Sequence, residues 1–196
     1  MKKVLSLLLL AFVMCQCNSQ TTQNKTEEKS LRDQYPEKFT ENYICDRAKT
    51  LIDFVPDHAF DPSIKPAFTE SYYNLLEEAW AVPVDNEYIG DEEFLYYFLT
   101  GNGDCNCDSH PKTILDFKLL EDDIAWVKMN YIHQDHEMLL HFENGEWVIA
   151  DFDGTKEQLE DYIRNQRDYL KNLDLDSILN EEYKTSIETY FNKYPN

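Results

Sequence analysis

Residues 112–152 carry the feature that most restricts the fold, four short apolar segments separated by polar turns. The segments KTILDFKLL, IAWVKMNYI, EMLLHF and EWVIADF are rich in β-branched and aromatic residues, and EDD, HQDH and ENG separate them. Such residues fit pleated strands, and short polar interruptions join antiparallel neighbours. Asn144-Gly145 is the strongest turn signal, because a type I′ turn needs positive φ at both central residues. We therefore expect a four-stranded antiparallel meander.

The segments on either side of these strands have helical spacing. Apolar residues recur at that spacing between residues 44 and 55, and Thr69 is placed to cap a second helix. After the strands, Thr155 and Gln158 have the pattern of a capping box, and a last helix is expected near residues 175–194. The predicted fold class is α+β, with N-terminal helices packed on a curved four-stranded antiparallel meander and two C-terminal helices.

The first residues have the pattern of a bacterial export signal. Two lysines precede an apolar run over residues 4–14, which is too short for a permanent membrane span. A cysteine at the end of such a run resembles the lipobox of bacterial lipoproteins, and this resemblance implies an acylated cysteine that anchors the chain to a membrane. We expect Cys17 to carry the lipid, since polar residues start directly after it, with Cys15 as the alternative. An ordinary cleaved signal peptide or an uncleaved membrane anchor is the other interpretation.

These features divide the chain into three parts. Residues 1–17 form the expected lipoprotein signal peptide with its lipobox-like Cys17. Residues 18–35 are almost entirely polar and offer little apolar surface to bury, so we expect a disordered tether. Residues 36–196 are expected to form a single α+β domain, with a cone-like core at about 68–152 and C-terminal helices over 155–194.

The last predicted strand and its turn resemble a known fold family. The stretch NGEWVIADF is similar to the final strand of nuclear transport factor two-like, or cystatin-like, cone folds, which occur in uncharacterised bacterial lipoproteins. The residues that carry the resemblance are Gly145, Trp147, Ile149, Asp151 and Phe152. The resemblance covers about residues 68–152 and implies a concave sheet face closed by helices. Enzymes, ligand binders and contact modules all use this geometry, so it does not assign a function.

The net charge of the chain limits the classes of partner that it can bind. The formal net charge is -20, and removing residues 1–16, which carry two lysines and no acids, makes it -22. A surface of this sign repels nucleic acid and anionic membranes and attracts basic partners or cations. We therefore expect no nucleic-acid partner, and we expect membrane association only through the lipid anchor.

Residues 103–110, GDCNCDSH, form a dense group of potential metal ligands. In a meander, the start of strand one lies at the same end of the sheet as the turn between strands two and three. The candidate ligands for a zinc-like ion would then be Cys105, Cys107, His110, His133, Asp135 and His136. Their spacing is not a common zinc pattern, and we expect no cofactor, with the metal site as the alternative.

The same cysteines are candidates for a disulfide. An extracytoplasmic compartment oxidises thiols, and after lipidation of Cys17 we expect Cys45 to pair with Cys105 or Cys107. A bridge that closes about 60 residues stabilises a fold by about 4 kcal/mol in the chain-entropy model. It also requires the first helix to pack beside the start of strand one.

Two functions are compatible with these features. The first is a membrane-anchored, extracytoplasmic binding or interaction module without catalysis, whose partner is a protein or a small ligand. The alternative is a cone-fold hydrolase or isomerase that uses His141 and Asp151, or a metal at the edge of the Cys105–His110 loop. An open, polar cavity with a histidine would favour the enzyme. An interior filled by tryptophan and phenylalanine would favour the module.

The disulfide hypothesis and the metal-site alternative predict different masses and metal contents for the purified protein. Protein prepared without chelator should contain no zinc, and its mass should be lower than the reduced mass by the two hydrogen atoms lost when one disulfide that involves Cys45 forms. Stoichiometric zinc that is lost in Cys107→Ser or His110→Ala protein would instead establish the metal site.

Overall fold

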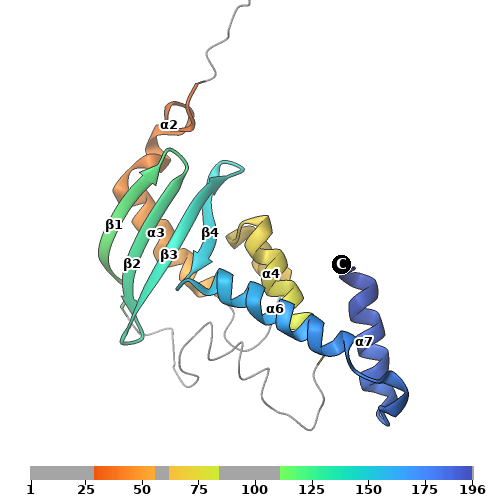
Figure 1. Cartoon of the computed structure of the whole chain (residues 1–196). Helices are drawn as coiled ribbons and strands as arrows, with labels where there is room; N and C mark the ends of the chain where they lie inside the picture. Colours follow the sequence, from red (N-terminus) through yellow and green to blue (C-terminus); the bar gives the residue numbers. More distant parts are fainter. Residues whose placement is uncertain (1–28, 56–61, 84–110, 196) are drawn as a thin grey trace, which may run out of the picture.

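The computed structural model of the chain describes residues 29–55, 62–83 and 111–195, which form one curved antiparallel sheet and the helices around it (Figure 1). The strands are β1 (Thr113–Glu121), β2 (Ile124–Tyr131), β3 (Gln134–Glu143) and β4 (Glu146–Phe152). They lie in the order β1-β2-β3-β4, and each neighbouring pair is antiparallel. The predicted α+β class and the four-stranded meander are therefore confirmed.

Two of the turns between strands have left-handed backbone at both central residues. Asn144 and Gly145 have φ of 53° and 82°, which confirms the predicted hairpin turn. The β2–β3 turn is placed one residue earlier than predicted, at Ile132 and His133, with φ of 53° and 63°. This turn has no glycine or asparagine and hence no sequence signal. As a consequence β3 begins at Gln134, and Asp135 and His136 belong to the strand.

Helices precede and follow the sheet. Those with at least two turns are α3 (Glu41–Leu51), α4 (Glu70–Ala81), α6 (Thr155–Lys171) and α7 (Glu181–Lys193). The shorter helical segments are α2 (Leu31–Gln34), η1 (Pro36–Phe39), η2 (Ile52–Phe54), η3 (Pro62–Ala67) and η5 (Leu175–Ser177). Thr40 and Thr69 cap α3 and α4 by accepting a hydrogen bond from an amide three residues later, at 3.3 Å in each helix.

The folded part of the chain begins before residue 36. Leu31 and Tyr35, in the stretch that the sequence assigns to the tether, pack against the core, and the Tyr35 ring lies 5.3 Å from that of Phe142. The ring of Tyr35 also lies 3.7 Å from the position that a Cβ on Gly145 would take. The last part of the expected tether therefore contributes to the packing.

The helical segments that precede the strands bury one face of the sheet. In Figure 1, α3 crosses behind the strands, and the structure places no described helix in front of them. The residues that alternate toward this buried face are apolar; they include Ala125, Val127, Met129, Met138, Leu140, Phe142, Trp147 and Ile149. Trp147 is fully buried, and its ring lies 5.2 Å from Phe39 and 5.3 Å from Phe142.

The start of α6 differs from the predicted capping box. Gly154, with φ of 69°, is the N-cap, and no side chain caps the helix at this position. Thr155 is the first helical residue, is buried, and hydrogen-bonds the hydroxyl of Tyr72. Asp151 takes over part of the capping, because its carboxylate accepts the amide of Lys156 at 3.0 Å.

The predicted last helix is also shorter than expected. Asn180 accepts the amides of Glu182 and Tyr183 at 3.0 and 3.1 Å, so α7 starts at Glu181 and not near 175. Leu179 lies before the helix and is 97% exposed. The capping asparagine explains the break, because its side chain replaces the hydrogen bonds of a continuing helix.

The two C-terminal helices extend away from the sheet and do not close it. Helix α6 packs on α4, and α7 packs in a second apolar cluster. The buried members of this cluster are Val82, Leu170, Tyr183, Ile187 and Tyr190. Glu78 accepts Arg167 Nε at 2.7 Å and the Tyr190 hydroxyl at 2.9 Å, which joins α4, α6 and α7. Burial, together with the bond to Glu78, raises the pKa of Tyr190 to about 12.

The position of Trp147 predicts a large effect of substitution on stability. Its indole N–H donates to the carbonyl of Lys38 at 2.8 Å. Trp147→Phe leaves that carbonyl without its donor and leaves a void, so we expect a loss of about 2–4 kcal/mol in the free energy of unfolding by urea. Trp126→Phe, on the open face, is the matched control and should lose less than about 1 kcal/mol. Equal losses would contradict this account of the core.

Candidate functional site

The structure brings together part of the predicted metal site. Cys105, Cys107 and His110 lie outside the described residues, so the metal alternative and the disulfide both remain predictions. His136 lies at the start of β3, and its Nδ1 is 2.7 Å from Asp153 Oδ2, just after β4. The residues that follow the β2–β3 turn therefore meet the end of β4.

His136 and Asp153 have the geometry of a histidine oriented by a carboxylate. Such a pair serves as a general base when the other ring nitrogen faces a substrate. Here the histidine is 6% exposed, turns toward the core, and stacks on Phe152 with ring centres 5.2 Å apart. Asp153 also accepts the amide of Glu137 at 2.6 Å, and its own amide donates to the Glu137 carbonyl at 2.8 Å. The pair therefore joins the ends of β3 and β4.

The other ligand candidates at this end are separated from the pair. Asp135 accepts the side-chain amide of Asn130 at 2.9 Å and lies 3.7 Å from the ammonium group of Lys128. His133 is exposed in the turn. Within the ranges that the structure describes, no three histidine, cysteine or acidic side chains lie close enough to hold a metal ion.

The residues of the alternative enzyme lie on the other face of the sheet. His141 is opposite Val148 and Asp151 is opposite Leu139, so the two are not cross-strand partners. No hydrogen bond or ion pair joins these two described side chains, and the carboxylate of Asp151 accepts the Lys156 amide at the start of α6. The structure does not bring this pair together.

The open face of the sheet is covered by paired polar side chains. Trp126 lies at its centre, where its indole N–H donates to Glu137 at 3.2 Å and Lys118 Nζ lies 4.5 Å from its ring. Lys128 Nζ lies 3.6 Å from Glu137, which adds a second cross-strand pair. Alternation of charges across neighbouring strands stabilises a solvated sheet face by a few tenths of a kcal/mol for each pair.

A polar groove runs between α3 and β1 and has a volume of about 450 Å³. We call it the β1 groove; its lining residues are Glu41, Asn42, Cys45, Asp46, Lys49 and Ile114 to Phe117. Lys49 Nζ lies 3.0 Å from Asp46. Cys45 is 8% exposed, and Lys112 Nζ donates to the Lys49 carbonyl at 2.8 Å, so α3 does pack beside the start of β1. The Cys45 thiol is free in the structure, and the predicted disulfide stays a prediction because Cys105 and Cys107 lie outside the described residues.

A second polar cluster fastens the N-terminal segments to the β3–β4 turn. The carboxylate of Glu146 accepts the hydroxyl of Tyr43 at 2.8 Å and the ammonium group of Lys38 at 3.2 Å. Lys38 also donates to the Gly145 carbonyl at 2.6 Å, and Arg47 donates to the Trp147 carbonyl at 3.1 Å. Burial alone would raise the pKa of Glu146, but the bonds from Tyr43, the Trp147 amide and Lys38 outweigh it and lower that pKa.

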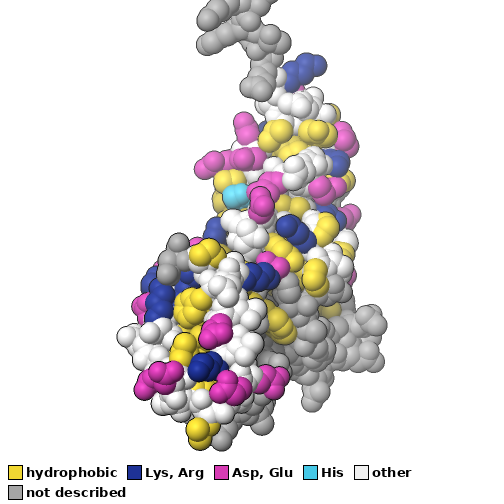
Figure 2. Space-filling view, turned by 90° about the vertical axis from the view of Figure 1, so that its right-hand side faces the viewer, with side chains coloured by type: hydrophobic (Ala, Val, Ile, Leu, Met, Phe, Trp, Pro, Cys, Tyr) yellow, Lys and Arg dark blue, Asp and Glu magenta, His cyan; other side chains and the backbone are white. Residues whose placement is uncertain are grey.

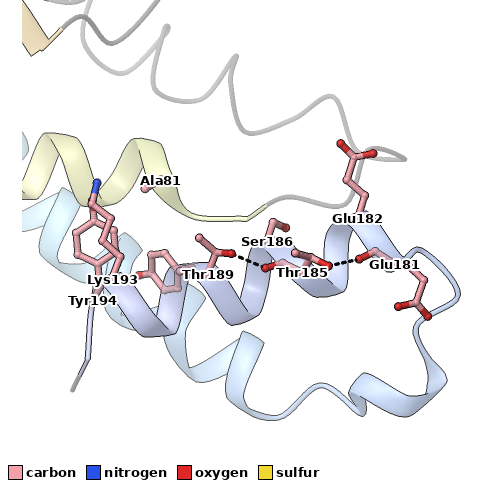
Figure 3. A pocket seen from close by; sticks show the side chains of 9 residues that line it. Ala81, Glu181, Glu182, Thr185, Ser186, Thr189, Lys193 and Tyr194 are labelled. Carbon is pink, nitrogen blue, oxygen red and sulfur yellow. Dashed lines mark hydrogen bonds between the residues drawn. The ribbon is translucent and has the colours of Figure 1, made fainter.

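A larger cavity lies along α7, with a volume of about 640 Å³ (Figure 3). Its wall is a row of hydroxyls that bond their own helix: Thr185 donates to the Glu181 carbonyl and Thr189 to the Thr185 carbonyl, both at 2.8 Å. These hydroxyls are occupied as donors, so the polar groups of the wall that could donate to or pair with a ligand are mainly its charged side chains, Glu181, Glu182 and Lys193. From the side on which α7 lies, acidic and basic side chains are interspersed with hydrophobic ones (Figure 2).

Comparisons with known proteins do not add a function to this geometry. No protein-family model, curated protein or solved structure matches the chain. None of the helices in residues 29–55, 62–83 and 111–195 combines the length and the apolar character of a membrane span. The site must therefore be argued from the residues themselves.

Sequence reasoning missed two of these arrangements. The structural pair is His136 with Asp153, and strand parity gives the reason: residue 136 shares the core-facing positions of Met138 and Leu140, whereas His141 has the opposite parity. The β1 groove was also missed. Glu41, Cys45, Asp46 and Lys49 do recur at helical spacing, but only the packing of α3 shows what this stripe faces.

The lowered pKa of Glu146 predicts how stability changes with pH. A carboxylate with a lowered folded-state pKa stabilises the fold above its unfolded pKa of about 4.3, and this contribution is lost as pH falls through the folded value. Glu146→Gln should therefore reduce the free energy of unfolding by about 1–2 kcal/mol at pH 7, and the difference from wild type should shrink below about pH 4. Urea unfolding across this range measures it.

Glu143→Gln is the control for this experiment. Glu143 is the cross-strand neighbour of Glu146 and carries the same charge. Removing it should leave stability at pH 7 unchanged or slightly increased, because it relieves repulsion between two facing carboxylates. A loss as large as that of Glu146→Gln would show that the effect comes from overall charge and not from the Lys38 and Tyr43 contacts.

Proposed function

We propose that the chain is a lipid-anchored interaction module on the extracytoplasmic side of a bacterial membrane, in the periplasm or at the cell surface, and that it acts by contact and not by catalysis. The observation that carries this proposal is the filled interior of the sheet. Phe39, Phe142 and Trp147 pack against one another with ring centres 4.7 to 5.3 Å apart. A cone-like enzyme needs an accessible pocket on the inner face of its sheet, and in this chain aromatic side chains fill that place.

The polar groups support the same function, since each candidate pair is engaged in the structure. His136 and Asp153 connect two strand ends beneath Phe152, and Asp151 accepts an amide of α6. The cavity along α7 and the β1 groove are lined by no histidine. A general base and a substrate pocket are therefore not found together at any of these places.

The proposal also includes the attachment of the chain to the membrane. We assign the lipid to Cys17, followed by a polar tether that leads to the folded domain at Leu31. The four-stranded curved sheet with helices is compatible with the cone-like fold of nuclear transport factor two-like and cystatin-like proteins, and we propose that relationship for the fold. A tethered domain of this size meets membrane-bound partners at a raised effective concentration.

Photo-crosslinking in cells tests this function. A photoreactive phenylalanine analogue would replace, one at a time, four side chains around the surface: Leu120, Trp126, Tyr169 and Leu179. We expect a discrete protein adduct at some of these positions and not at others, because a module binds its partner through one surface. The Cys17→Ala protein should lose both fatty-acid labelling and the adduct, since it is released from the membrane.

Two results would contradict the proposal. Absence of a discrete adduct at every position in the tethered protein would remove the support for a contact function. Hydrolysis or isomerisation of a substrate by the purified protein that is lost in His141→Leu protein which keeps its fold would point back to the enzyme alternative. If Cys15→Ala abolishes labelling and Cys17→Ala does not, the anchor is Cys15.

A further inference from the structure

We infer that the β1 groove binds an extended, lysine- or arginine-bearing segment of a partner protein, which adds to β1 as a fifth strand. The inference rests on the proposed function, because it names the surface and the partner chemistry of an interaction module. It is carried by the edge of β1 that no described strand pairs with, by the dimensions of the groove and by the charge of its lining.

The two edges of the sheet differ. Beside β4, Phe68 forms a parallel bridge with Ile149, and the amide of Thr69 donates to the Ile149 carbonyl at 2.8 Å. In the described part of the chain, β1 pairs with β2 alone. The amide of Phe117 donates to the side chain of its neighbour Asp116 at 2.9 Å, so a side chain satisfies a donor that an added strand would use.

The groove has the length that a short strand needs. Its wall on α3 runs from Glu41 to Lys49, which corresponds to about 12 Å along a helix axis. Its floor is Ile114 to Phe117, and the three steps between four residues of a strand span about 10 Å. Leu115 is 48% exposed at this edge and offers an apolar contact to an alternate side chain of the added strand. A helix on one side and a strand edge on the other is the geometry of peptide binding by β-augmentation.

The lining selects a basic segment. Glu41, Asp46 and Asp116 contribute three carboxylates to the lining and Lys49 contributes one ammonium group. Asp116 also lies 3.6 Å from Lys118 Nζ, so Glu41 and Asp46 on α3 are the carboxylates that would meet a basic side chain. Lys49 already pairs with Asp46, and the whole chain has a net charge of -20, so an acidic segment would be repelled. Basic side chains on one face of the added strand would meet Glu41 and Asp46, while its backbone bonds β1.

A second copy of the chain is the competing occupant of this edge. Asp116 and Lys118 flank Phe117, so two β1 strands could pair antiparallel with these charges matched. Such pairing continues the sheet and brings the two α3 helices toward each other across the symmetry axis. Glu41 and Asp46 would then lie near their own copies, and like charges at an interface cost several kcal/mol. The charge distribution therefore favours a basic partner over self-association.

Peptide binding to the purified chain tests the inference. The probe is a short fluorescent peptide in which lysine and valine alternate, and the control peptide has the same charge with proline in place of valine. We expect the alternating peptide to bind at least about tenfold more tightly by anisotropy, because proline cannot donate to a strand. Hydrogen exchange of the β1 amides, including that of Phe117, should slow only with the alternating peptide.

Matched variants identify the site. The triple variant Glu41→Gln, Asp46→Asn, Asp116→Asn should weaken binding by about tenfold or more. The control removes three exposed carboxylates from α6 and α7 through Glu157→Gln, Glu160→Gln and Glu188→Gln, and it should bind as wild type does. Circular dichroism of both variants checks that the fold is retained.

Three outcomes would overturn the inference. Equal binding of the two peptides, or equal losses in the two variants, would mean attraction by net charge alone. Protection of the β1 amides in a dimer without peptide would make a second copy the occupant. Peptide binding without slower exchange in β1 would place the contact elsewhere. If photo-crosslinking gives discrete adducts while this test fails, the interaction function stands and only its assignment to the β1 groove is wrong.

Discussion

The arrangement of this domain depends on the burial of one tryptophan. Trp147 is fully buried, yet it carries an indole N–H that must be bonded, and the donor reaches the carbonyl of Lys38 in the segment before α3. Its own carbonyl accepts Arg47 from α3, and Phe39 packs on its ring. These contacts require the N-terminal helical segments to lie on the face of β4 that Trp147 occupies. No described helix covers the opposite face of the sheet, where Trp126, Glu137, Lys118 and Lys128 form cross-strand pairs.

Much of the sheet could be predicted because its signals are local. The alternation of apolar residues in β2 and the Asn144-Gly145 turn depend on neighbours in the chain, and both were predicted correctly. Where local signals compete, the prediction was wrong. Thr155 has the sequence pattern of a cap, but a bond to Tyr72 on another helix places it in the first turn of α6. The turn at Ile132 and His133 has a conformation that those residue types do not signal.

The candidate sites were harder to predict, for a physical reason. Strand parity places His136 among core residues and His141 on the open face, but the sequence pattern assigned His136 to the turn before the strand, where no parity applies. The β1 groove depends on contacts between α3 and β1, which lie about 65 residues apart in sequence, and no local pattern encodes how such elements pack. Cys45 was singled out for its chemistry, and the structure adds that it lines the wall of this groove.

The second apolar cluster implies that α7 can detach and re-form without unfolding of the sheet. Helix α7 contributes nothing to the core beneath the sheet; it rests on Leu170, Val82 and the group formed by Glu78, Arg167 and Tyr190. Such a unit opens at a lower free energy than the strands, because fewer apolar contacts resist its departure. We therefore expect α7 and the sheet to unfold as two separate cooperative units. Changes in temperature or sequence that release the last helix should leave the sheet and its buried tryptophan as the more persistent part of the described structure.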